Sequence, residues 1–170
     1  MSDDQPVNFT ISESRQASEK SLNQPKEDIA IPETLQGGPS LEEEGKARIF
    51  SRPEIIRIAL ALCEQLIPLH EEVPPAAYGA IKPDNIHLED GWYPRLSPRQ
   101  EEDESTGETA TPGKDVYDLG LLMNWLLHGK SVPLFEPRDG LEQIIYRCTC
   151  EEYKRRYHNA SRVRKALLEL

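Results

Sequence analysis

The sequence lacks most of the features that mark secreted, membrane and metal-binding proteins. It has only three cysteines in 170 residues, and the spacing Cys148-x-Cys150 has no second pair of ligands, so no metal site is expected. Cys63 lies in an apolar stretch, which is typical of a buried thiol. No hydrophobic run approaches the ~20 residues of a membrane span, and the N-terminus has no signal-peptide pattern. We therefore expect a cytoplasmic protein without membrane contact.

The sequence is also poor in positive charge. Its 20 lysines and arginines face 30 aspartates and glutamates, which gives a formal net charge of −10. Nucleic acids and anionic membranes bind proteins that present a basic face. The charge balance therefore argues against both as default partners, and an acidic mimic of DNA is the alternative that it leaves open.

The composition divides the chain into two parts. Residues 1–46 are acidic, carry few large apolar residues and show no period, so they cannot bury enough surface to offset their ordering entropy. We expect a flexible acidic tail there, with at most one helical turn around LEEEGKARIF. Apolar residues become dense near Ser51, and residues 47–170 are long enough to form one domain.

Hydrophobic periodicity within the domain predicts a mainly α-helical fold. Helices are expected over 51–70, 115–128, 141–150 and 159–170, the first opened by a capping box of Ser51 and Glu54 and the second ended by Gly129. A short hairpin is predicted over 86–96, with its turn at Asp90-Gly91 and Pro94 on an edge strand. Residues 97–114 are polar and acidic and are expected to form a loop.

One motif points to a known family. The stretch AYGAIKPDNIHLEDG (77–91) follows the first predicted helix and leads into the hairpin. With GKDVYDLGLLMNWLLHG and LEQIIYRCTCEEYKRRYHNASRVRKALLEL in the same order, it resembles the C-terminal lobe of Hanks-type serine/threonine protein kinases, bacterial members above all. The resemblance runs from about residue 55 to residue 170 and implies a kinase C-lobe fold. A kinase N-terminal lobe is not expected, because no glycine-rich loop occurs and too few residues precede Ser51.

The resemblance also implies that the chemistry is lost. Phosphoryl transfer needs a carboxylate that positions the hydroxyl, a lysine at the phosphates and groups that hold two metal ions. Lys82 and Asn85 match the family's phosphate-contacting lysine and metal-binding asparagine, but Ala80 stands where the catalytic aspartate belongs. Near Pro98, where the second metal-binding aspartate is expected, no aspartate occurs. Lys82 and Asn85 are then either surface and turn residues or vestigial nucleotide contacts.

Two further matched positions carry structural roles in the family. Asp115 resembles the helix aspartate that hydrogen-bonds the backbone of the catalytic loop, and Arg156 resembles the arginine that pairs with a glutamate of the activation segment. That glutamate's motif is missing here. Arg156 is therefore expected either to meet an acid of the 101–108 loop or to be solvated or packed locally.

These observations favour a catalytically inactive pseudokinase that acts as a protein-binding, scaffolding or regulatory module, with an active kinase or another signalling component as the candidate partner. No cofactor is expected. One alternative is a residual nucleotide sensor, or a kinase fragment completed by another chain, in which ATP binds weakly. Another is that the acidic tail is itself the interaction or phosphorylation segment. A basic cluster could dock that tail or an acidic partner, or form only a solvated helix face: Lys154, Arg155, Arg162, Arg164 and Lys165.

Overall fold

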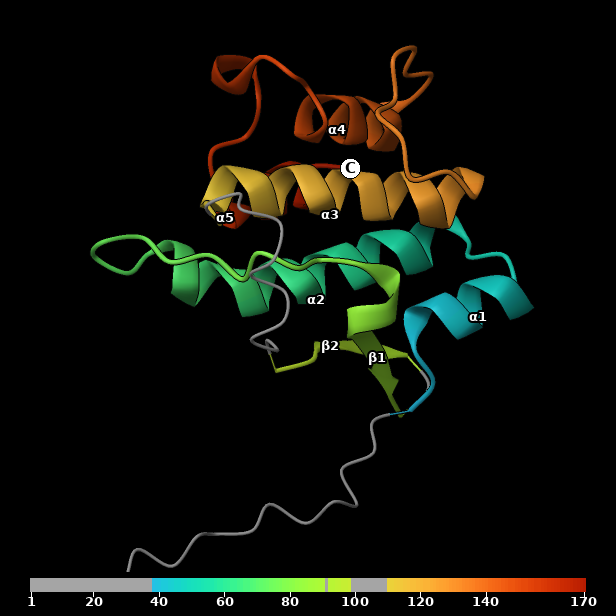
Figure 1. Cartoon of the computed structure of the whole chain (residues 1–170). Coiled ribbons are helices and arrows are strands. Elements are labelled where there is room, and N and C mark those ends of the chain that lie inside the picture. The colour runs from blue at the N-terminus through green and yellow to red at the C-terminus, as the bar shows by residue number, and fades with distance from the viewer. Residues whose placement is uncertain (1–37, 91, 99–109) are drawn as a thin grey trace, which may run out of the picture. The chain divides into compact units, whose positions relative to one another are not determined.

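The computed structural model describes residues 38–90, 92–98 and 110–170. These residues form a mainly α-helical fold with one small antiparallel hairpin, as the sequence predicted (Figure 1). In chain order the elements are α1 (Leu41–Ala47), α2 (Arg52–His70), the 3₁₀ turn η1 (Pro83–Asn85), β1 (Ile86–Glu89), β2 (Tyr93–Leu96), α3 (Pro112–His128), α4 (Gly140–Cys148), the 3₁₀ turn η3 (Tyr153–Arg155) and α5 (Ala160–Leu168).

Local signals at the helix ends explain where the long helices begin and stop. Glu54 accepts hydrogen bonds from the Ser51 N–H (2.8 Å) and the Ser51 hydroxyl (2.7 Å), which confirms the predicted capping box of α2. Helix α3 ends at Gly129, whose φ of 70° is the left-handed conformation that glycine adopts without strain. Asn159 caps α5 by accepting the Arg162 N–H at 3.1 Å.

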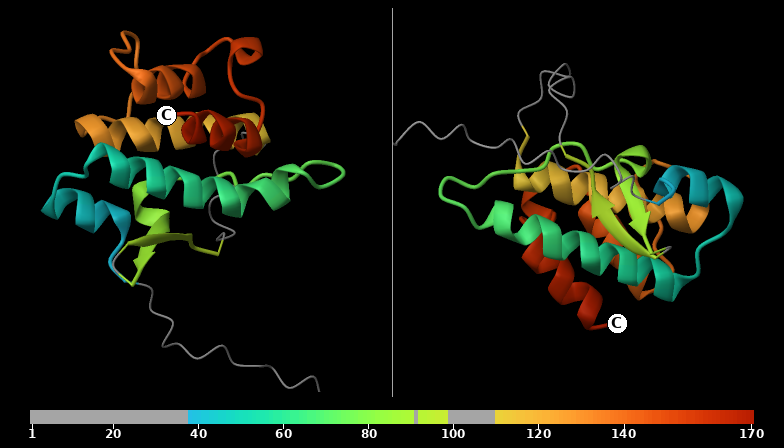
Figure 2. Two further views of the ribbon diagram at one scale, coloured as in Figure 1. Left: turned by 180° about the vertical axis from the view of Figure 1, so that it is seen from behind. Right: turned by 90° about the horizontal axis from the view of Figure 1, so that it is seen from below.

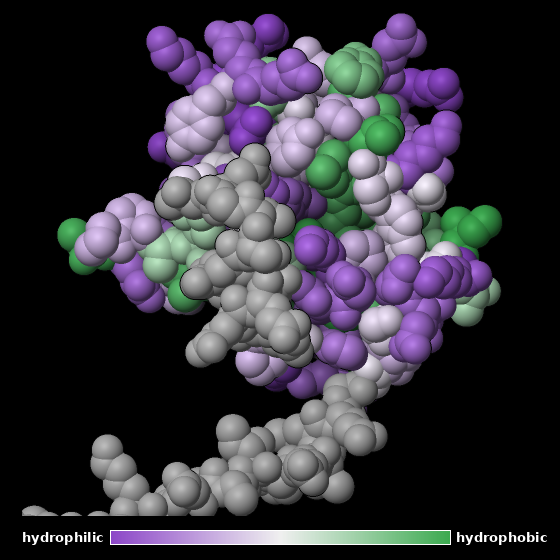
Figure 3. Space-filling model, viewed as in Figure 1, coloured by the Kyte–Doolittle hydropathy of each residue, from purple (hydrophilic) through white to green (hydrophobic). Residues whose placement is uncertain are grey.

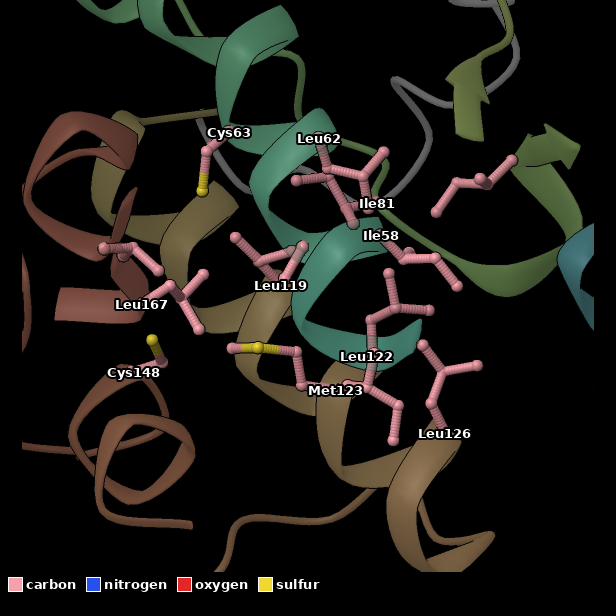
Figure 4. Packing of buried hydrophobic residues seen from close by; sticks show 14 of the residues in the cluster. Ile58, Leu62, Cys63, Ile81, Leu119, Leu122, Met123, Leu126, Cys148 and Leu167 are labelled. Atoms are coloured by element: carbon pink, nitrogen blue, oxygen red, sulfur yellow. The ribbon is translucent and has the colours of Figure 1, made fainter. Parts of the chain in front are cut away.

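The core lies where α2, α3, α4 and α5 meet. Helix α2 packs against α3 and α5, and α4 lies on the other side of α3 (Figures 1 and 2). Met123 of α3 is fully buried among residues from each of these helices (Figure 4). Gly120 lets α4 come close, because a Cβ at this position would lie 2.6 Å from the Cβ of Cys148. The close contact between α3 and α4 thus depends on residue 120 having no side chain.

The hairpin is held by its buried residues Ile86 and Leu88, which belong to the hydrophobic core, and by one amide side chain of α2. Its register pairs Leu88 with Pro94, and Asp90 in the connecting turn has a positive φ of 51°, as an Asp-Gly turn requires. Gln65 of α2 donates to the Pro94 carbonyl (2.7 Å) and accepts the Leu96 N–H (3.1 Å). This contact fixes the hairpin, and with it the preceding η1 turn, against the helix.

The expected boundary between tail and domain was placed too late. Residues 38–46 were assigned to the tail, yet Ser40 and Glu43 form a capping box (3.2 and 2.9 Å) that opens α1, and Leu41 is fully buried. The acidic run 42–44 belongs to the first turn of this helix, where negative charge is stabilising. Residues 1–37, and residues 99–109 of the predicted loop, lie outside the described part of the chain.

Candidate functional site

The segment between α2 and the hairpin is held by one buried carboxylate. Asp115, at the start of α3, has no exposed surface. Its Oδ2 accepts the Tyr78 N–H and its Oδ1 accepts the Gly79 N–H, both at 2.7 Å. Gly79 has a φ of 83°, so the chain turns sharply at the residue that Asp115 holds. The shape of this turn is therefore set by a side chain more than thirty residues further along the chain.

His70 extends this network to a third helix. Its Nδ1 accepts the Ala160 N–H (3.0 Å) at the start of α5, and its Nε2 lies 3.0 Å from Oδ2 of Asp115. Because Nδ1 is an acceptor, the neutral imidazole carries its proton on Nε2 and donates it to Asp115. His70 is 6% exposed. One buried pair thus connects the end of α2, the turn at Tyr78, α3 and α5.

The turn presents no acid or base at position 80. Ala80 is 3% exposed and its methyl group belongs to the hydrophobic core. The Asn85 side-chain amide donates to the Ala80 carbonyl at 3.1 Å, so this asparagine closes the turn. Pro98 is exposed just after β2, and the neighbouring Ser97 is tied back to the turn by its N–H bond to the Asn85 carbonyl (2.9 Å). The backbone is well braced, but these positions supply no general base.

Lys82 lies on the wall of a groove of about 800 Å³. We call this hollow the α1 groove. It is bordered by α1, by the η1 turn and by the C-terminal end of α3. Its size falls within the range of ligand-binding pockets. Apolar side chains in its lining are Ile49, Phe50, Pro83, Trp125, Leu126 and Leu127.

The charged side chains of the α1 groove divide into paired and unpaired groups. Arg48 bonds Glu54 (2.7 Å) and Glu44 (3.0 Å), and these hydrogen bonds raise its pKa. Glu54 receives the Ser51 hydroxyl and N–H as well as Arg48, which lowers its pKa to about 2. By contrast, Lys82 is exposed and forms no ion pair with any other residue that the structure describes. Its ammonium group is available to a ligand.

Arg156 is packed locally. Its Nε and Nη2 donate to the Cys150 carbonyl (3.0 and 2.8 Å), its Nη1 donates to the Gly113 carbonyl (3.1 Å), and its guanidinium lies 4.8 Å from the centre of the Tyr117 ring. It joins the start of α3 to the segment after α4. The acidic loop 101–108, the other contact expected for Arg156, lies outside the residues that the structure describes.

The predicted basic cluster is spread over two elements. Lys154 and Arg155 lie on η3, while Arg162, Arg164 and Lys165 lie on α5. Arg164 bonds Glu64 of α2 at 3.3 Å, and Arg155 lies 3.8 Å from Glu152. The cluster therefore combines residues already paired with carboxylates and residues that contact no carboxylate of the described part of the chain.

Sequence reasoning missed the buried partners and the groove. His70 gave no signal because its partners Asp115 and Ala160 are distant in the sequence. Glu142 gave none either, because the Arg52 side chain that it bonds at 3.4 Å lies ninety residues away. Glu142 is 2% exposed and accepts the Arg138 N–H at 2.7 Å, with the His128 Nε2 at 3.3 Å. Ile49, which is 91% exposed beside the α1 groove, had a faint signal as an isolated large apolar residue between two helices.

No metal centre is found in the described ranges, which contain no group of three or more His, Cys, Asp or Glu side chains able to hold an ion. Burial raises the pKa of the Cys63 thiol to about 12 and that of Cys148 as well, so both remain protonated. Of the helices that the structure describes, none has the length and apolar character needed to cross a membrane.

Comparison with protein-family models gives no match for this chain, and comparison with curated proteins gives none either. The fold and the site define a mainly helical domain with a braced turn, a small hairpin and an open groove.

Proposed function

We propose that the chain is a catalytically inactive protein resembling the C-terminal lobe of serine/threonine kinases, and that it works as a protein-binding module. The observation that carries the proposal is the contrast within one turn. Asp115 and Asn85 hold the backbone between residues 78 and 85, as an intact kinase-like loop would need, while the buried Ala80 methyl occupies the position that resembles the catalytic aspartate. The turn has kept its shape without a proton acceptor.

The α1 groove is the surface we assign to the partner. Ile49 is 91% exposed beside half-buried Trp125, and Lys82 forms no ion pair within the described structure. Burying a side chain of this size on binding contributes about 1.5–3 kcal/mol. An apolar anchor with an adjacent positive charge is a typical arrangement for recognising a segment of another protein.

Capture from an extract of the source cells tests this function. Ile49→Asp should abolish recovery of the specific partner, because it places a charge against an apolar contact. Val73→Asp is the matched control, since Val73 is 98% exposed and does not line the α1 groove. Equal loss in both variants, or equal recovery in both, would contradict the assignment of the groove.

The position of Lys82 also favours a second candidate, weak nucleotide binding. A nucleotide phosphate beside Lys82 should stabilise the protein, by ~2.7 kcal/mol when the ligand is at 100 times its dissociation constant. A thermal shift with millimolar ATP and magnesium that disappears in Lys82→Ala would support this function. The absence of any shift would exclude nucleotide binding.

The third interpretation, a functional acidic tail, concerns residues outside the described part and is tested by deleting residues 1–37.

A further inference from the structure

A second hollow lies on the opposite side of the core from the hairpin, against α4. Its volume is about 430 Å³ and it shares no lining residue with the α1 groove. We call it the α4 pocket. Six of its lining residues are polar or able to bond an anion: Gln143, Tyr146, Arg147, Cys150, Arg155 and Tyr157. The end of the molecule that carries α4 and η3 is largely hydrophilic (Figure 3).

The charge of the α4 pocket is opposite to that of the chain. Among the residues that the structure describes, two guanidinium groups line it and no carboxylate does, although the net charge of the sequence is −10. The sequence that supplies both arginines is itself basic, because residues 147–165 hold seven lysines and arginines against two glutamates. A cavity lined by one sign of charge attracts groups of the other sign.

Arg147 is held in place by uncharged partners. Its Nε donates to the Arg155 carbonyl at 3.2 Å, and its guanidinium lies 4.4 Å from the centre of the Tyr157 ring. No carboxylate of the described residues forms an ion pair with it. The Arg147 guanidinium is therefore oriented but not neutralised. Part of the side-chain conformational entropy that binding a ligand would remove is already lost in the free protein.

We propose that the α4 pocket binds a carboxylate-rich segment of a partner protein. Because the Arg147 Nε is occupied, the two terminal nitrogens remain, and a carboxylate can span such a pair with two parallel hydrogen bonds. Arg155 supplies the second positive charge. Its contact with Glu152 is long, at 3.8 Å, and both side chains are more than 60% exposed, so an incoming carboxylate can replace Glu152 at low cost.

This site goes beyond the proposed groove function and does not depend on it. Ile49→Asp should leave binding at the α4 pocket unchanged, and changes at Arg147 should leave capture through the groove unchanged. The two proposals can therefore fail separately.

Fluorescence anisotropy with a decaglutamate peptide carrying a neutral dye tests the proposal on the full chain. Arg147→Glu should weaken binding at least about tenfold, since it removes the oriented charge and adds a repulsive one. Arg147→Lys keeps the positive charge but not the planar guanidinium that forms two parallel hydrogen bonds, so it should weaken peptide binding by roughly threefold. Lys130→Glu is the matched control. It changes the net charge equally, lies outside the pocket and should alter affinity less than twofold.

Arg147 also contributes to packing, so Arg155→Glu provides a second variant whose side chain is 64% exposed. It too should weaken binding, while its thermal unfolding stays close to that of the wild type. Equal effects of Arg147→Glu and Lys130→Glu would show nonspecific charge attraction and overturn the proposal. Binding of a phosphoserine peptide of equal charge, with none of decaglutamate, would overturn it in favour of phosphate recognition.

Discussion

Replacing Asp115 with alanine should lower the free energy of unfolding more than any other single substitution at the turn. The substitution removes the acceptor of the Tyr78 and Gly79 N–H groups, both at 2.7 Å, and of the His70 imidazole at 3.0 Å. A buried donor without a partner costs about 1–3 kcal/mol. Because the Gly79 N–H is only partly buried, we expect a total loss of about 3–5 kcal/mol, a large fraction of the ~5–15 kcal/mol by which domains are stable.

Urea denaturation followed by far-UV circular dichroism measures this loss. Asp84→Asn is the matched control in the same turn, because Asp84 is exposed, and it should change the free energy of unfolding by less than about 0.5 kcal/mol. A loss below about 1 kcal/mol for Asp115→Ala would refute the reasoning, since water or an alternative acceptor would then satisfy the three donors.

Three further changes test other parts of the structure. A Cβ at Gly45 would overlap the Trp125 ring, while alanine favours the α1 helix by about 1 kcal/mol, so Gly45→Ala should give a net loss of up to about 2 kcal/mol in the same urea assay; a more stable variant would contradict this packing. With a thiol reagent at pH 8, half-buried Cys150 should react first, while Cys63, whose pKa burial raises to about 12, and the third thiol should react only after unfolding. The pKa of Glu54 is lowered to about 2, so its stabilising contribution is present above its unfolded pKa near 4.5 and is lost as the pH falls toward 2. Glu54→Gln should therefore reduce the fall in stability across that interval, and an unchanged acid profile would argue against the cap.

The elements that sequence reasoning predicted are those with local signals. Ser51 and Glu54 lie three residues apart, Gly129 follows the last helical residue of α3, and Asp90 begins the three-residue connection between β1 and β2, so each element end could be read within one short window. Helix α1 has the same kind of signal in Ser40 and Glu43, but its acidic first turn continues the charge pattern of the preceding residues, so the sequence predicts only one helical turn there, within the tail.

The candidate site was less accessible because it is built from distant residues. The pair of His70 and Asp115 spans 45 residues, and the α1 groove joins α1 to the end of α3, about eighty residues further on. No periodicity or spacing links such positions. The role of Asp115 at the turn was expected only from the family resemblance, and the orientation of Arg147 depends on a backbone carbonyl that no sequence pattern identifies.

Phosphotransferase activity tests the central claim, a kinase-like turn kept for its shape, most directly. Radiolabelled ATP with magnesium and a generic protein substrate should give no incorporation above the protein-free background for the wild-type chain. Ala80→Asp should give none either, because under the proposed resemblance a second metal-binding aspartate would be needed near Pro98, where none occurs, and the sequence contains no glycine-rich loop. Incorporation by the wild type, or activity gained by Ala80→Asp alone, would contradict the account.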